Sequence, residues 1–192
     1  MKKYLLLFLI ASLMLPATSC QKNSLDPLGY QVYPFYVEGC LVAEDTEYVF
    51  KLTMNTADNS EISFSKPESL RGYVFNVTPE GTTLSYGDMT IDFSKTEKTN
   101  LIRLIPSLFA LNQQDHVSSE DKILNSVDIL LSKYSTDTGE VSVYLNKSTQ
   151  TPLRFEGEGF VLDVLKFASP STPEPTISPE TTPTDTAEQS NK

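Results

Sequence analysis

The sequence predicts a mainly β (α+β) domain: an antiparallel incomplete barrel or curved sheet of about 8–10 strands, with one or two helices packed on its concave face. Three observations predict it. Apolar and polar residues alternate with a period of two over most of residues 33–167, and short turns rich in Gly, Asp and Asn separate these runs. A single segment, Leu101–Leu111, shows helical spacing instead. Turns this short join antiparallel neighbours, because parallel strands need connections of a dozen or more residues.

The first 20 residues, MKKYLLLFLIASLMLPATSC, have a basic start, an apolar run Tyr4–Leu15 and small residues before Cys20, as bacterial export signals do. The apolar run is shorter than the roughly 20 residues that a membrane-spanning helix needs. The junction resembles the lipobox of bacterial lipoproteins, whose cysteine is acylated, with palmitate-type chains, and becomes the first mature residue. The resemblance implies a signal peptide at residues 1–19, lipidation of Cys20 and attachment to the extracytoplasmic side of the cell membrane.

Residues 20–28 are polar and contain Pro27, so they predict a tether between the lipid and the domain. Fully extended, the eight residues Gln21–Leu28 reach at most about 26 Å. The folded domain is expected at residues 29–168, a length that builds a core without disulfides or metal.

The chain has a formal net charge of −10, and −12 once the leader is removed, with 13 basic against 25 acidic residues. The acidic residues are scattered along the sequence. The sequence has no cluster of Lys and Arg of the kind that nucleic-acid binding requires. Anionic headgroups would repel such a surface. We therefore expect the lipid on Cys20 alone to hold the protein at the membrane.

Cys40 is expected to be a small buried hydrophobe within a strand, because no His, Lys or Arg neighbours it in sequence to lower the pKa of its thiol. A Cys20–Cys40 disulfide is the competing arrangement if Cys20 is not acylated.

The first half of the domain predicts a meander of short strands. Pro34 suggests that the first of them begins at a sheet edge. The expected strands are Tyr33–Ala43, Glu47–Asn55, a short strand from Ile62 to Phe64, Tyr73–Thr78, Leu84–Tyr86 and Met89–Ser94.

In Leu101–Leu111 the apolar residues fall on one helical face, which predicts an amphipathic helix. Pro106 predicts that this helix is kinked or begins only near the proline. The polar residues Gln113–Asp121 predict a loop, followed by a short helical turn at Glu120–Leu124.

Strands are expected again at 127–134, 140–145, 153–158 and 160–167. The last is apolar on both faces, which predicts a central strand or one lying between the core and a helix or cavity. Residues 169–192 are rich in Pro, Thr and Ser and predict a disordered tail, since they hold too few apolar groups to offset the entropy of ordering.

The residue types needed for catalysis are scarce. His116 is the only histidine and is expected in the polar loop, where a lone histidine is solvated more often than catalytic. One His and one spare Cys give no zinc ligand set, and no nucleotide-binding or nucleophile-elbow motif occurs. We expect neither an enzyme nor a bound cofactor or metal.

Three features together resemble the LolA/LolB-like superfamily of exported lipoprotein carriers: the segment ISFSKPESLRG at Ile62–Gly72, the helix after the meander, and the closing run GEVSVYLNKSTQTPLRFE before the last strand. The resemblance implies an incomplete antiparallel barrel around helices, with an apolar cavity for acyl chains.

The resemblance also implies a concave ligand face covered by the helix. Aromatic and Met side chains at period two suit a filled core as well as a lined cavity. The face would carry Tyr48, Phe50, Leu52, Met54, Tyr73, Phe75, Met89 and Ile91.

The leading expectation is a non-catalytic, membrane-anchored exported lipoprotein that binds a hydrophobic or lipid-like ligand. The alternative is a structural or regulatory module that binds another exported protein through an exposed strand edge such as Tyr33–Ala43. An enzyme acting on cell-envelope material comes third.

Overall fold

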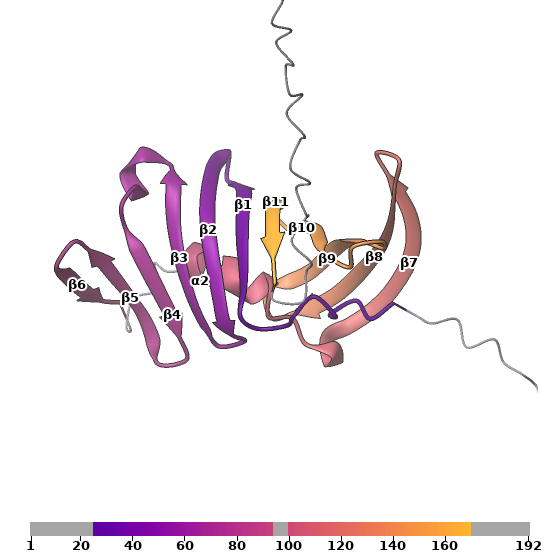
Figure 1. Cartoon of the computed structure of the whole chain (residues 1–192), viewed down its shortest axis with the longest axis horizontal. Helices are drawn as coiled ribbons and strands as arrows, with labels where there is room; N and C mark the ends of the chain where they lie inside the picture. The colour runs from indigo at the N-terminus through magenta and orange to yellow at the C-terminus, as the bar shows by residue number, and fades with distance from the viewer. Residues whose placement is uncertain (1–24, 94–99, 170–192) are drawn as a thin grey trace, which may run out of the picture.

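A computed structural model describes residues 25–93 and 100–169. These residues form one antiparallel sheet of eleven strands in the order β6-β5-β4-β3-β2-β1-β11-β10-β9-β8-β7, with the helix α2 (Asn100–Leu108). Figure 1 shows β6 at one end of the curved sheet and β7 at the other, with β1 and β11 between them. The mainly β fold class, a curved antiparallel sheet with a helix, is confirmed.

The first half of the chain forms a six-stranded meander in which each strand pairs with the next. Alternating residues place one side of β1, β2 and β3 toward the core, as in β2, where Phe50, Leu52 and Met54 are buried. The strands are β1 Phe35–Ala43, β2 Thr46–Thr56, β3 Asn59–Lys66, β4 Val74–Thr78, β5 Gly81–Tyr86 and β6 Met89–Asp92. The 3₁₀ turn η1, Glu68–Leu70, joins β3 to β4.

The second half forms a five-stranded meander that continues the sheet on the other side of β1. It begins after the 3₁₀ turn η3, Gln113–Asp115. Its strands are β7 His116–Leu124, β8 Val127–Thr136, β9 Gly139–Asn146, β10 Pro152–Gly157 and β11 Phe160–Ala168.

The two meanders join where β1 pairs with β11. Val37 lies opposite Phe167, Leu41 opposite Leu162 and Ala43 opposite Phe160, with a bulge between Glu38 and Gly39. The prediction that β11 is central is confirmed. The prediction of an exposed edge at Tyr33–Ala43 is wrong, because β1 is hydrogen-bonded to β2 on one side and to β11 on the other.

The position of Pro34 explains why an edge was expected there. The proline precedes Phe35, the first residue of β1. Its lack of an N–H therefore removes no hydrogen bond between β1 and its neighbouring strands. A proline at the start of a strand is compatible with a central strand.

The 3₁₀ turn η3 and strand β7 stand where a polar loop, Gln113–Asp121, and a helical turn, Glu120–Leu124, were expected. Its residues are mostly polar and exposed because β7 is an outer strand that, in the described sheet, pairs only with β8. Cross-strand polar contacts support it, including the 2.8 Å contact between Ser119 Oγ and Ser132 Oγ. This strand raises the count from the expected 8–10 to eleven.

Helix α2 follows β6 and precedes β7 in the chain. It crosses one face of the sheet, behind the central strands as Figure 1 is drawn. Ile105, Leu108 and Phe109, at the end of the helix and just after it, are buried in the core. Pro106 lies in the last helical turn, so the alternative that the helix begins near Pro106 is wrong. The turn closes with tighter bonds, from the Phe109 N–H to the Pro106 carbonyl and from the Ala110 N–H to the Ser107 carbonyl.

The core therefore lies between the sheet and α2. The Phe109 ring contacts Phe155 of β10 with ring centroids 4.7 Å apart and Phe35 of β1 at 6.2 Å. Phe109, directly after the helix, thus contacts both halves of the sheet.

The segment before β1 also packs on this core. Tyr30 is buried, with its ring edge-on to Phe167, and Leu25 and Leu28 are partly buried against the core. The Gln31 side-chain amide donates to the Leu111 carbonyl at 3.0 Å. Packing thus includes Leu25, the first described residue, which lies inside the expected tether. Cys20, the leader and the tail from residue 170 lie outside the described residues.

No helix in the described residues is both long and apolar enough to cross a membrane.

Truncation of Phe109 tests this packing. Phe109→Ala removes a fully buried ring between β1 and β10, so we expect the free energy of unfolding to fall by about 3–5 kcal/mol, measured by urea denaturation. The control Val117→Ala, at a residue that is 59% exposed, should change it by less than about 0.5 kcal/mol. A loss below about 1 kcal/mol for Phe109→Ala would contradict the described core.

Candidate functional site

A hollow of about 660 Å³ lies between α2 and the turns at one rim of the sheet. We call it the α2 hollow. Its lining residues come from the helix, from the start of β2 and β11, and from three hairpin turns. They are Ala43, Glu44, Tyr48, Leu101, Arg103, Leu104, Ser107, Thr138, Glu158, Gly159 and Phe160.

The register of β1 and β11 brings two of these turns together. Ala43 lies opposite Phe160, so the β1–β2 turn that begins with Glu44 and the β10–β11 turn with Glu158 are neighbours. Glu44 has a positive φ of 49°, as the first residue of a tight two-residue hairpin turn does. Two carboxylate side chains are thereby placed on the same rim.

The walls of the hollow are apolar. Tyr48, Leu101, Leu104 and Phe160 are each partly buried, with one side packed on the core. Because their remaining surface borders the hollow, an apolar ligand can cover it and remove it from water.

The helix is open to solvent along its outer side. Two smaller hollows of about 450 and 320 Å³ lie along the rest of α2, and Ser107 lines all three. Packing between α2 and the sheet is therefore dense at Ile105 and Leu108 and loose around the exposed residues Arg103 and Ser107.

Among the described residues, Arg103 is the one cation that lines the α2 hollow. Its Nε donates to Thr82 Oγ1 at 3.1 Å, and Thr82 of β5 is fully buried. This bond holds the guanidinium at the start of β5, beside the β4–β5 turn, where Arg103 also lines one of the smaller hollows. None of the ion pairs in the described part of the chain involves Arg103, Glu44 or Glu158.

The outer face of the sheet carries several cross-strand polar pairs. Arg154 Nε donates to Asp163 Oδ1 at 2.6 Å, and the Tyr144 hydroxyl donates to Glu156 Oε2 at 2.6 Å. The bond to Glu156 and burial raise the pKa of Tyr144 to about 12. Part of this face is therefore satisfied by contacts within the sheet.

The eight residues of the expected ligand face do not stay together. Phe50, Leu52, Met54 and Phe75 are buried in the core. Tyr48 is half-buried and lines the α2 hollow. The other three lie beyond it: Tyr73 is half-buried with its ring 5.0 Å from that of Tyr86, while Met89 and Ile91 are exposed on β6.

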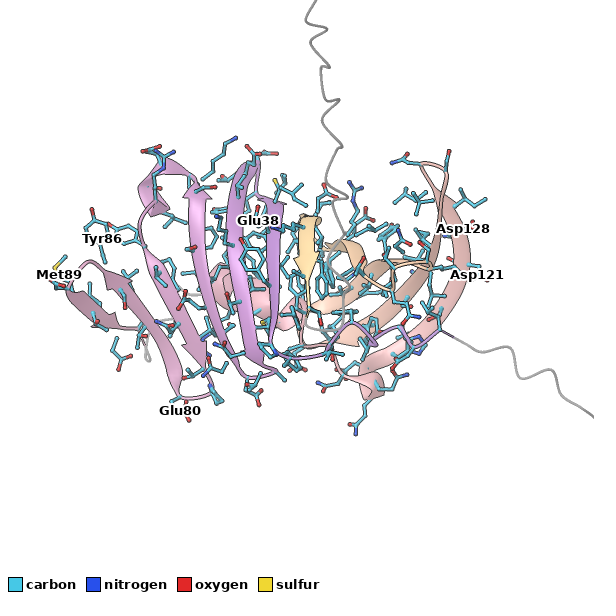
Figure 2. The ribbon with its side chains drawn as sticks, viewed as in Figure 1. Glu38, Glu80, Tyr86, Met89, Asp121 and Asp128 are labelled. Atoms are coloured by element: carbon cyan, nitrogen blue, oxygen red, sulfur yellow. The ribbon has the colours of Figure 1, made fainter. Side chains whose placement is uncertain are left out.

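Figure 2 shows Met89 and Tyr86 at the outer end of the sheet near β6, and Glu80 at the far end of β4 and β5. The sequence interpretation did not name Arg103, Glu44, Glu158 or Phe160 as site residues. Turn residues give no periodic signal, and only the pairing of β1 with β11 brings two of these turns together.

His116 does not lie in a loop as expected; it is the first residue of β7. Its Nε2 lies 2.7 Å from Ser119 Oγ, and its ring packs edge-on against Tyr134. Ser119 is exposed on an outer strand of the sheet, away from the residues of the α2 hollow. The described residues contain no group of three or more His, Cys, Asp and Glu placed to hold a metal ion.

Cys40 is a free, partly buried cysteine on the outer face of β1. Burial raises the pKa of its thiol, and so does Glu47, whose Oε1 lies 3.6 Å from the sulfur. Lys66 opposes this shift but pairs with Glu47 at 2.9 Å. Cys40 is therefore mostly a neutral thiol near pH 7.

The fold and the hollow define a class: an antiparallel curved-sheet domain with one helix on its concave face and an apolar hollow beside that helix. No protein-family model and no curated protein matches the chain.

Solved structures do match. An uncharacterized conserved protein from Thermus thermophilus aligns at 15% identity and a TM-score of 0.49, over 72% of this chain and 80% of that one. A DUF1329 family protein from Desulfovibrio piger aligns at 12% identity and a TM-score of 0.43, over 77% of this chain and 89% of that one. A LolA superfamily protein from Nitrosomonas europaea aligns at 12% identity and a TM-score of 0.35, over 72% of this chain and 86% of that one. Because these TM-scores are below 0.5, the function proposed below rests on this chain's own residues.

The environment of Cys40 leads to a prediction about its reactivity. Glu47→Gln removes a carboxylate that raises the thiol pKa, so the thiolate fraction and the rate of iodoacetamide alkylation at pH 8 should rise roughly twofold to fivefold. The measurement uses a chain that starts at Gln21, in which Cys40 is the only cysteine. Glu61→Gln, an exposed change on β3, is the control and should leave the rate unchanged; an unchanged rate in Glu47→Gln would contradict the assigned contact.

Proposed function

We propose that this protein is an exported, non-catalytic lipoprotein, held on the extracytoplasmic side of the cell membrane by a lipid on Cys20. Its β domain binds a hydrophobic or lipid-like ligand in the α2 hollow. The observation that carries the binding proposal is the hollow itself: about 660 Å³, bordered by Tyr48, Leu101, Leu104 and Phe160. Ligand sites in proteins are typically hollows of about 300–1,000 Å³ with apolar walls and a few polar groups.

The tether supports a position close to the bilayer. Leu25 is packed against the core, and the five residue steps from Cys20 to Leu25 span at most roughly 17 Å. A ligand that leaves the bilayer would therefore have a short path to the domain.

A second candidate function, binding another exported protein, is favoured by the edge at β6. Tyr86, Met89 and Ile91 are 49%, 61% and 49% exposed there, beside backbone groups that no further strand of the described sheet pairs. An extended segment of a partner could add to this edge and cover these side chains. The edge proposed for such a partner is thus β6 and no longer β1.

The anchor can be tested by fractionation. Cys20→Ser in the full chain should move the protein from the membrane fraction to the soluble exported fraction, because no other group is proposed to hold it there. Ser19→Ala serves as the control and should leave the protein with the membranes. Retention of the Cys20→Ser protein in the membrane fraction would contradict the proposed anchor.

The ligand site can be tested by filling it. Ser107→Trp adds a large exposed side chain in the α2 hollow, so we expect the lipid mass that co-purifies with the Gln21–Lys192 chain to fall several-fold in native mass spectrometry. Ser118→Trp makes the same change on exposed β7 and should retain the lipid. Equal lipid occupancy in both variants, or no lipid on the unmodified chain, would count against the proposed site.

A further inference from the structure

The concave face of the sheet stays apolar out to the β6 edge. Leu84 of β5 lies opposite Phe75 of β4 on one side and opposite Ile91 of β6 on the other. Tyr86 lies two residues along β5 from Leu84 and opposite Met89. Residues that lie opposite each other, or two apart on one strand, point to the same side of a sheet. All five therefore lie on the side of the core, where Phe75 is buried, yet the three nearest the edge are exposed.

The backbone of β6 shows which groups are open at this edge. The Phe93 N–H donates to the Thr82 carbonyl of β5. Backbone groups alternate in direction along an antiparallel strand, so the N–H and C=O of Met89 and Ile91 also point toward β5. Those of Thr90 point away from β5, to the side where the described sheet has no further strand. Thr90 therefore offers one donor and one acceptor at the edge.

The opposite edge of the sheet differs, because β7 carries charges along its middle. Glu120 pairs with Lys122, and Asp121 pairs with Lys147. Charged side chains on an outer strand discourage its pairing with another chain. The four residues of β6 include a single charged one, Asp92. Of the two edges of the described sheet, β6 is thus the one better suited to pairing.

Two copies of β6 fit one another in one register. Antiparallel pairing through the open groups places Thr90 opposite Thr90 of the second copy, as a pair that exchanges two hydrogen bonds. Met89 of each copy then lies opposite Ile91 of the other, on the concave side. These apolar pairs continue the rows that Tyr86 and Leu84 begin within each copy. Exposed apolar side chains of both copies are thereby covered.

We propose that β6 pairs with β6 of a second copy of this chain, about a two-fold axis at Thr90. The same surface serves both copies, so the contact closes as a dimer and does not extend into a chain of molecules. The contact involves only four strand residues from each copy, so the dimer is weak, with a Kd on the order of 100 µM. The inference does not rest on the α2 hollow, and it names a different occupant for the edge at which another exported protein was considered.

The same register brings like charges together on the convex side of the sheet. Asp92 lies two residues after Thr90, and Asp88, in the turn before β6, lies two residues before it. Asp92 of one copy therefore comes close to Asp88 of the other, and like charges opposite one another oppose pairing. Salt screens this repulsion, so we expect the dimer to tighten as the salt concentration rises from about 0.05 to 0.5 M.

Sedimentation equilibrium of the Gln21–Lys192 chain, from about 5 to 500 µM, should show a monomer–dimer equilibrium. Thr90→Pro removes the N–H that faces the edge and no bond to β5, so it should abolish the dimer. Thr90→Val keeps that N–H and should retain the dimer. A chain that stays monomeric, species larger than a dimer, or an undiminished dimer in Thr90→Pro would overturn the inference. Lipid binding is measured separately, so these results would leave the proposed lipid site standing.

A charge variant should strengthen the dimer, which a misfolded protein would not do. Asp88→Asn removes one member of each like-charge pair, so the dimer should tighten several-fold and depend less on salt. Glu61→Gln makes the same kind of change at an exposed residue of β3, three strands from the edge, and should leave the Kd unchanged. An Asp88→Asn dimer that is no tighter than the unmodified one would overturn the proposed register.

Cysteine cross-linking tests the two-fold axis directly. In a Cys40→Ala background, Thr90→Cys places two thiols where the Cα atoms of a hydrogen-bonded pair lie about 5.5 Å apart, within reach of a disulfide. Mild oxidation should therefore give a covalent dimer. Ser85→Cys, opposite Thr90 but one strand in from the edge, is the control and should stay monomeric. Equal cross-linking of the two variants, or none of Thr90→Cys, would overturn the inference.

Discussion

The first strand of the sheet pairs with the last, and this pairing sets the position of everything else in the molecule. Because β1 and β11 are neighbours at the centre, β6 and β7 become the two outer strands although they are consecutive in the chain. The connection between them must cross from one end of the sheet to the other. Helix α2 lies in that connection, and its apolar side faces the core through Ile105, Leu108 and Phe109.

The α2 hollow follows from the same geometry. A helix of nine residues is only about 13 Å long, so it covers the middle of a wide, curved face and leaves space near the rim. The same β1–β11 register sets the turns with Glu44 and Glu158 side by side at that rim. On the outer face, by contrast, cross-strand pairs such as Arg154 with Asp163 satisfy the charges locally. The unpaired carboxylates of Glu44 and Glu158 thus lie beside apolar surface at the α2 hollow.

Local pattern in the sequence is enough to predict most of the fold. Alternation predicts strands such as β2, where Phe50 and Leu52 are buried, and helical spacing predicts α2. Strand β7 escapes prediction because an outer strand needs no apolar face. The central position of β1 and the site at the rim depend on the pairing of strands that are far apart in the chain. A local sequence pattern does not reveal such pairing. Of the expected ligand face only Tyr48 lines the hollow, since residues that alternate cleanly are those that fill the core.

The central claim is that an acyl chain lies between α2 and the rim of the sheet. Photo-crosslinking with a lipid that carries a diazirine in its acyl chain, followed by peptide mapping, tests it most directly. The account predicts adducts on Leu101, Leu104, Tyr48 and Phe160. Adducts confined to Tyr86, Met89 and Ile91 at the β6 edge, with none in the α2 hollow, would contradict it.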